Sequence, residues 1–246
     1  MIEFFRKIRQ NLLSEGKTGK YLKYAIGEIV LVVIGILIAL QINNWNNNRI
    51  EHKIETNILS EILVNLEKDI INLNSKITYN NNKTKLNRDV LEHLEQRTPL
   101  TDSLKWSYAR IIGRGNFEPI TVAYENLKSK GIDIIHNDSL RIAISELYDF
   151  KYFYLTEDLR YDYEHVKSLH ETEAYKNIKT IFRGDLDQRW AEPVNLAEIQ
   201  NNIYFQEVLK QAIGFYSYMN STYKRGIKEN MAVQEQIKNE LKQREK

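Results

Sequence analysis

The longest uninterrupted apolar run lies near the N-terminus. Residues 29–40 read IVLVVIGILIAL. As a helix this run covers only about 18 Å, whereas residues 24–42 cover about 28 Å, close to the roughly 30 Å hydrocarbon core of a bilayer. The pattern therefore predicts a transmembrane helix over 24–43, preceded by a cytoplasmic segment, 1–23, and followed by a helical extracytoplasmic domain, 44–246.

The flanks of this run indicate its interfaces and its direction. Tyr21 and Tyr24 precede it, and Trp45 follows it among asparagines, as is typical of residues at the bilayer surface. Residues 1–23 carry six Lys or Arg against two Glu. Because Lys and Arg are retained on the cytoplasmic side, we expect a cytoplasmic N-terminus. In a Gram-negative bacterium, the residues after about 45 would then be periplasmic and the anchor would lie in the inner membrane.

Two other interpretations of the run remain open, a cleaved signal peptide and a buried core helix. A signal peptide would end in small residues at a cleavage site. Here Ala39-Leu40-Gln41 leads directly into bulky polar sequence without an A-x-A pattern. The sequence therefore favours an uncleaved anchor.

Three residues within the span suggest more than anchoring. Glu28 lies one turn inside the cytoplasmic edge, where an ionisable side chain is either functional or pairs with Lys20 or Lys23 at the interface. Gly35 and Ala39 form a small-xxx-small pair that permits close packing of two helices. Self-association through this pair is a hypothesis.

The segment before the span is amphipathic. Its apolar residues fall on one helical face and its basic residues towards the other, a pattern typical of a helix that lies in the headgroup layer. The lipid bilayer is thus the first partner that the sequence predicts. The apolar residues are Phe4, Phe5, Ile8 and Leu12, and the basic ones are Arg6, Lys7 and Arg9.

The start of the chain combines the motif YAIGE at residues 24–28, the apolar run after it, and QINNW at residues 41–45. In these residues it resembles a bacterial family of membrane proteins, the domain-of-unknown-function family 6090. A looser similarity covers residues 119–148. The resemblance implies an envelope protein of Gram-negative bacteria with a helical region beyond the membrane. It brings no catalytic residues, but the family's recurrent glutamate at Glu28 keeps a functional role for that residue open beside the pairing at the interface.

The region after the span reads as a long amphipathic helix. Gly and Pro are absent between Leu37 and Thr98. Apolar residues recur every three or four positions, which predicts a helix over 50–96 that the asparagines at 80–82 interrupt. The recurring residues are Ile54, Ile58, Ile62, Leu66, Ile70, Leu73 and Ile77.

Breakers and capping residues divide the remainder. Pro99 ends the long helix, Thr101 or Ser103 caps the next, and Asn195 with Glu198 forms a capping box. The predicted elements are a loop at 113–119, a helix at 120–130, an extended segment or turn at 132–135, a helix from Asn137 or Asp138 to about 176, a loop at 183–193 and a helix at 196–242.

The last helix keeps a narrow apolar edge of Val233, Ile237 and Leu241 among charged residues. Such an edge suits packing against a neighbouring helix, in the manner of a coiled coil. We therefore expect an all-α fold, in which one N-terminal transmembrane helix is followed by an elongated antiparallel helical bundle.

Composition supports this class and excludes others. Of the 246 residues 42% are hydrophobic and 28% charged, as in folded proteins, and only ten Gly and three Pro interrupt the chain. The absence of Cys excludes disulfides and thiolate chemistry. After residue 23 the chain is near neutral, so it has no strong field for nucleic acid, and no nucleic-acid partner is expected.

Catalytic and metal-binding patterns are weak. Asp133 with His136 and Asp162 with His165 have Asp-x-x-His spacing, but a di-metal bundle needs Glu-x-x-His pairs on facing helices. Phosphate loops, nucleophile elbows and zinc-protease signatures are absent from the sequence. We therefore expect no metal, no cofactor and no enzymatic activity.

Aromatic residues crowd two of the predicted helices, around 148–163 and 204–223. Such residues either fill a bundle core or form a stacking surface for a ligand, a peptide or a partner helix. The first cluster supplies the candidates for an interaction surface, namely Tyr148, Tyr152, Phe153, Tyr161 and Tyr163.

The leading hypothesis is a non-enzymatic, membrane-tethered protein of the cell envelope that acts through a helical periplasmic interaction domain. Its partner would be a second copy or another envelope protein. The alternative is a periplasmic ligand-sensing domain. Because only about 23 residues remain in the cytoplasm, such a sensor would act through a partner protein.

Overall fold

A computed structural model of the chain describes residues 6, 18–181 and 189–244. The chain forms two compact units, Met1–Glu55 and Thr56–Lys246. The described part of the first unit is, apart from Arg6, the beginning of helix α2 (Thr18–Gln96). The amphipathic helix predicted before the span lies otherwise outside the described residues.

Within the described residues, α2 contains the one stretch that is long and apolar enough to cross a membrane, and none of that stretch is buried. The side chains of Ile29, Leu31 and Ile42 are each at least 60% exposed. A core helix of the chain would bury such residues, and this stretch does not bury them. The sequence of the stretch is compatible with a membrane span.

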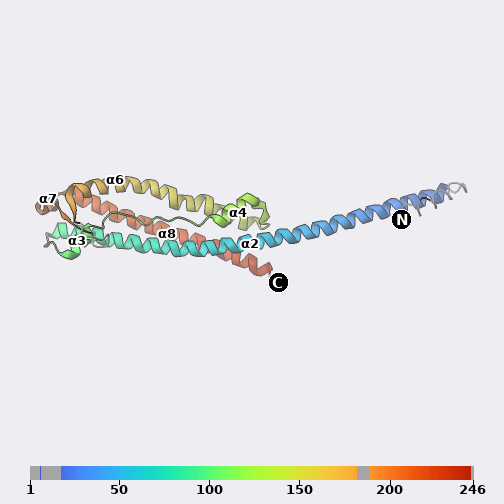
Figure 1. Cartoon of the computed structure of the whole chain (residues 1–246), viewed down its shortest axis with the longest axis horizontal. Helices are drawn as coiled ribbons and strands as arrows, with labels where there is room; N and C mark the ends of the chain where they lie inside the picture. The colour runs from blue at the N-terminus through green and yellow to red at the C-terminus, as the bar shows by residue number, and fades with distance from the viewer. Residues whose placement is uncertain (1–5, 7–17, 182–188, 245–246) are drawn as a thin grey trace. The chain divides into compact units, whose positions relative to one another are not determined.

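The second unit is a helical bundle, which confirms the predicted all-α class. Figure 1 shows α2, α6 and α8 running side by side in this unit, and α6 packs against α8. Its elements after α2 are α3 (Asp102–Tyr108), α4 (Val122–Lys130), the 3₁₀ turn η1 (Ile132–Ile134), α5 (Asp138–Glu146), the π turns η2 (Leu147–Lys151) and η3 (Tyr154–Asp158), α6 (Leu159–Asn177), β1 (Ile178–Ile181), β2 (Trp190–Pro193), α7 (Leu196–Asn201) and α8 (Ile203–Arg244).

Helices α2 and α8 are antiparallel. Polar contacts join Leu66 to Asn230, Asn81 to Asn220 and Glu95 to Lys210, at 3.0, 2.8 and 3.3 Å. Residue numbers therefore rise along α2 as they fall along α8. On the predicted apolar edge of α8, Val233 and Ile237 are buried.

Most predicted helix starts are confirmed by side-chain caps. The Oγ1 of Thr101 accepts from the Leu104 amide, and Asn137 and Asn195 accept from amides two or three residues ahead. The single helix predicted for 196–242 is wrong, however. Asn202 leaves the helical conformation, with ψ at 84°, and its side chain caps α8 through the Phe205 amide.

The interruption predicted at 80–82 is also wrong, because α2 continues through it. Asparagine disfavours helices when its side chain competes for nearby backbone groups. Here Asn80 accepts from the Gly115 amide, and Asn81 accepts from Asn220. These tertiary partners occupy the side chains, so the helix is undisturbed.

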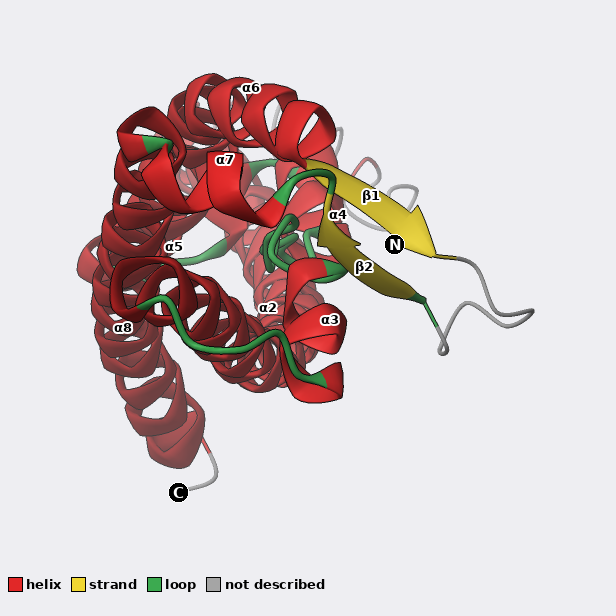
Figure 2. Cartoon of the chain, turned by 90° about the vertical axis from the view of Figure 1, so that its left-hand side faces the viewer, coloured by secondary structure: helices red, strands yellow, loops and turns green. Residues whose placement is uncertain are grey.

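The loop predicted at 183–193 contains a strand. β1 and β2 form an antiparallel pair, with Ile178 opposite Pro193 and Ile181 opposite Trp190 (Figure 2). Residues 182–188 lie outside the described part. The β-branched residues of β1 favour an extended backbone, but a four-residue strand is too short to show a period.

A stretch without helix or strand, residues 110–120, runs through the bundle between α3 and α4 (Figure 1). We call it the threaded segment. Its Ile111, Gly115 and Phe117 are buried, and buried backbone groups need hydrogen-bond partners. Side chains of the long helices supply them. Lys83 donates to the carbonyls of Arg110 and Ile112, Asn87 to that of Ile111, Tyr216 to that of Gly113 and Tyr223 to that of Gly115, while Asn80 and Asp69 accept from the amides of Gly115 and Ile120.

Candidate functional site

The aromatic residues of the first cluster lie on a segment with unusual helical geometry. The π turns η2 and η3 interrupt the helical path between α5 and α6. In η2 the amide of Tyr152 bonds to the carbonyl of Leu147, five residues back. Such an insertion rotates the following side chains relative to a regular α-helix. Because π turns are rare and often lie at functional sites, this segment is a candidate functional site.

The inward face of the segment is built from tyrosines. Tyr148 stacks on Tyr124 with ring centroids 4.5 Å apart, and Tyr152 meets Phe117 edge to face at 5.2 Å. Tyr148 and Tyr152 are 7% and 1% exposed. Their burial raises the pKa of both phenols. The hydroxyls therefore stay protonated and serve as hydrogen-bond donors, not as bases.

A buried carboxyl group lies against this tyrosine layer. Asp69 on α2 is fully buried and accepts a 2.9 Å hydrogen bond from the Ile120 amide. Burial raises the pKa of Asp69 from its usual 3.8 to about 6, and hydrogen bonds from Ile120 and Tyr152 offset part of that rise. Tyr152 in turn accepts from Asn230, which also donates to the Leu66 carbonyl. Asp69, Tyr152 and Asn230 thus connect the threaded segment, α2 and α8 by hydrogen bonds.

The outward face of the same segment carries exposed aromatic side chains. Phe150, Phe153 and Tyr161 are 69%, 55% and 82% exposed. We call these three residues the aromatic surface. Beside Phe150 a groove of about 470 Å³ separates the π turns from α8. The groove is lined by Phe150, Lys151, Tyr154, Leu155, Arg225, Gly226 and Glu229.

Close packing of α8 against the π turns shapes the groove. A Cβ atom at Gly226 would meet Leu155 Cδ1 at 2.5 Å, so the glycine permits this approach. The hydroxyls of Tyr154 and Tyr218 share a 2.5 Å hydrogen bond, and the Arg225 guanidinium lies 5.9 Å from the centre of the Tyr154 ring. The walls are therefore fixed by contacts between the two elements, while Phe150 remains free to meet a partner.

The structure divides the five predicted interaction residues between two faces. Tyr148, Tyr152 and Tyr163 are buried, and Phe153 and Tyr161 are exposed. The Arg114 guanidinium lies 4.4 Å from the centre of the Tyr163 ring, and burial raises the pKa of Tyr163 to about 12. Of the five predicted residues, only Phe153 and Tyr161 can therefore contact a partner at the surface. Phe150, which was not predicted, is exposed beside them.

The four residues predicted to matter in the span lie on the first part of α2. Glu28, Gly35 and Ala39 are seven and four positions apart, a spacing that places them on one helical face. Among the described residues, no atom outside the local helix backbone lies within 4 Å of a Cβ built at Gly35. Trp45 is 65% exposed, and the Arg49 guanidinium lies 5.7 Å from the centre of its ring. Roles for these residues stay predictions.

Sequence reasoning missed the buried polar groups of α2. Asp69, Asn80, Lys83 and Asn87 are each less than 10% exposed. A signal existed, because these residues continue the three-to-four spacing of the apolar face and occupy positions where a core residue is expected. Polar residues at such positions need buried partners, which here come from the threaded segment.

Comparison with known proteins identifies one matching family. Residues 28–181 match the family described as "Family of unknown function (DUF6090)". No curated protein and no solved structure matches the chain.

Proposed function

Since the chain belongs to the family of unknown function DUF6090, we propose from the geometry that it is a non-enzymatic binding protein that a membrane helix tethers to the cell envelope. The candidate span over 24–43 is the tether, and the bundle Thr56–Lys246 is the binding domain. The basic leader supports a cytoplasmic N-terminus, which would place the bundle in the periplasm.

The observation that carries this proposal is the aromatic surface. A folded segment that buries Tyr148, Tyr152 and Tyr163 nevertheless exposes Phe150 and Phe153, which have no polar atom to offer water. Exposed apolar side chains that gather beside a groove mark interaction sites, and aromatic anchors dominate the energetics of protein interfaces.

The groove suggests the chemistry of the partner. It has apolar walls in Phe150 and Leu155, and its charged lining residues are two basic ones, Lys151 and Arg225, against one acidic one, Glu229. A protein segment that inserts one apolar side chain and carries an acidic group beside it would fit both features. We therefore propose that the partner is an amphipathic segment of another envelope protein.

Crosslinking in intact cells tests the proposal. The full-length chain is compared with a double variant, Phe150→Ser with Phe153→Ser, and with a matched control, Ile142→Ser, which removes a 54% exposed apolar side chain from α5. We expect one defined heterologous adduct from the wild type and the control. The double variant should lose it by about tenfold or more, because interface anchors contribute roughly 2 kcal/mol or more each.

Two results would count against the proposal. One is recovery of monomer alone from wild-type cells, and the other is an adduct that the double variant retains in full. An adduct of two copies of the chain would replace the heterologous partner by self-association. Topology is tested in parallel with reporters fused after residue 20 and at the C-terminus, and a cytoplasmic C-terminus would remove the periplasmic assignment.

A further inference from the structure

A cavity of about 220 Å³ lies at the end of the bundle that carries the β1–β2 pair. It is built from residues other than those of the aromatic surface and its groove. Its walls come from α3, the threaded segment, α6 and the two strands. The lining residues are Tyr108, Ala109, Ile112, Ala174, Tyr175, Ile178, Thr180, Arg189 and Ala191.

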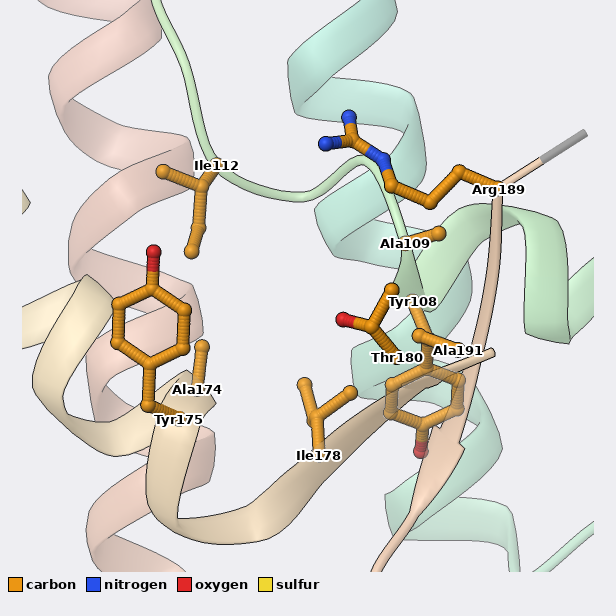
Figure 3. Close-up of a pocket in the computed structure, with 9 residues that line it drawn as sticks. All are labelled: Tyr108, Ala109, Ile112, Ala174, Tyr175, Ile178, Thr180, Arg189 and Ala191. Carbon is orange, nitrogen blue, oxygen red and sulfur yellow. The ribbon is translucent and has the colours of Figure 1, made fainter. Parts of the chain in front are cut away.

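The cavity has one polar edge and apolar walls. Figure 3 shows the Arg189 side chain reaching over the rim towards Ile112, and the Thr180 hydroxyl turned towards the same space. Ile112, Ile178 and Ala174 supply apolar surface around it. Such a combination orients a ligand by one charged group and holds the remainder by apolar contact.

Arg189 brings a positive charge for which the described residues supply no carboxylate partner. Its Nε is buried and lacks a hydrogen-bond partner, and among the described residues no carboxylate forms an ion pair with it. The acidic side chain on β2, Glu192, is already shared by Lys105 and Lys179, at 3.7 and 3.0 Å.

Two more cations lie beside Arg189. Arg110 donates a 2.7 Å hydrogen bond to the Arg189 carbonyl, and Lys83 donates to the carbonyl of the cavity residue Ile112 at 2.6 Å. Burial lowers the pKa of Lys83 to about 8, and the charges of Arg189 and Arg110 act in the same direction. Because three cationic side chains gather here, a carboxylate bound to the Arg189 guanidinium would be stabilised by charge attraction and by charge-assisted hydrogen bonds.

We propose that this cavity binds a small carboxylate with an apolar body, its carboxylate on Arg189 and its body between Ile112 and Ile178. The planar guanidinium matches a carboxylate with two parallel hydrogen bonds. Inorganic phosphate fits less well, because the apolar walls would leave several of its oxygens without donors. The volume is below the roughly 300–1,000 Å³ of pockets for drug-sized ligands, so the ligand is correspondingly small.

Titration calorimetry of the full-length chain in detergent tests the site with benzoate as the probe. Benzamide has nearly the same shape without the charge, and inorganic phosphate has the charge without the apolar body. Benzoate should bind, and benzamide and phosphate should bind at least about tenfold more weakly, because a hydrogen bond to a charged group contributes roughly 1.5–3 kcal/mol.

Variants link the binding to the residue. Arg189→Gln should lower benzoate affinity by about tenfold or more, whereas Arg88→Gln, which changes an exposed arginine on α2, should leave it unchanged. If Arg189→Gln fails to fold, Thr180→Val at an exposed strand position provides a second test, with an expected loss of about threefold to tenfold.

Three results would overturn the proposal. They are no benzoate binding by the folded protein at millimolar concentration, equal binding of benzamide and benzoate, and unchanged benzoate affinity in a folded Arg189→Gln variant. Equal binding of phosphate would show a general anion site and would overturn the assignment to an apolar carboxylate. Because the lining residues differ from those of the aromatic surface, failure here leaves the proposed protein interaction standing.

Discussion

The inward and outward faces of residues 147–163 use aromatic side chains in opposite ways. The buried face carries Tyr148, Tyr152 and Tyr163 beside leucines, whereas Phe150, Phe153 and Tyr161 are exposed. The hydroxyl groups of three buried tyrosines need hydrogen-bond partners, which a simple apolar core would not supply. This core is therefore organised around a polar element.

That polar element is the threaded segment. Its backbone groups are buried, so the side chains around it must donate and accept hydrogen bonds. Tyr216 and Tyr223 donate directly to its carbonyls, and Tyr152 links Asp69 and Asn230 next to it. Tyrosine combines the bulk of an aromatic ring with the required hydroxyl. The exposed phenylalanines have no such internal role, which is why we assign them to binding.

The largest expected effect comes from the inward face. Tyr152→Ala should lower the free energy of unfolding by about 3–5 kcal/mol, because it leaves a large cavity and removes a hydrogen-bond partner of Asn230. Denaturant unfolding of the full-length chain in detergent measures this. Tyr161→Ala on the outward face is the matched control and should change stability by no more than about 0.5 kcal/mol. Equal losses in the two variants would erase the distinction between the faces.

The carboxyl group beneath the inward face should make stability depend on pH. Because the pKa of Asp69 is raised to about 6, the folded chain holds a proton between about pH 4 and 6 that the unfolded chain has released. The free energy of unfolding therefore falls as pH rises through this window, by at most about 3 kcal/mol. Asp69→Asn should remove that fall and be more stable than the wild type at pH 7, by about 1–3 kcal/mol.

Unfolding curves of the two proteins from pH 4 to 7 measure this difference. Parallel pH profiles for wild type and variant would show that Asp69 is not held in a costly buried state. Water would then reach the inward face more easily than the burial of its tyrosines indicates.

The threaded segment itself is sensitive to added bulk. At Gly115 a Cβ atom would lie 2.8 Å from the backbone oxygen of Lys76. Gly115→Ala should therefore cost about 1–3 kcal/mol through overpacking. At Gly214, on α8, nothing lies within 4 Å, and Gly214→Ala should gain about 0.5–1 kcal/mol from helix propensity. Thermal unfolding of both variants compares them, and a neutral Gly115→Ala would mean that the segment is loosely held.

The smallest effect on stability should come from the outward face. The double variant Phe150→Ser with Phe153→Ser removes exposed side chains and should stay within about 0.5 kcal/mol of the wild type in the same unfolding measurement. A loss of 2 kcal/mol or more would assign both phenylalanines to the core and leave the proposed interface without its anchors.

Sequence patterns were sufficient for features that depend on near neighbours. The apolar run at 29–40, the caps at Thr101, Asn137 and Asn195, and the apolar edge at Val233 and Ile237 are all local. Each follows from the helical period or from hydrogen bonds within a few residues. Most helix starts and the all-α class could therefore be predicted.

The threaded segment could not be predicted from the sequence, because the residues that bind it are distant along the chain. Tyr216 and Gly113 are 103 residues apart, and Asp69 and Ile120 are 51 apart. The division of the aromatic residues between a buried and an exposed face could not be predicted for another reason. The π turns η2 and η3 shift the phase of the helix, so a period of 3.6 residues does not assign faces across them.

The most direct test of the account is photocrosslinking from the outward face. A benzoylphenylalanine is placed at Phe153, and in a second chain at Arg88, an exposed position on α2, and intact cells expressing each full-length chain are irradiated. The account predicts one protein adduct from position 153, identified by mass spectrometry, and no such adduct from position 88. No adduct from position 153, or the same adduct from both positions, would contradict it.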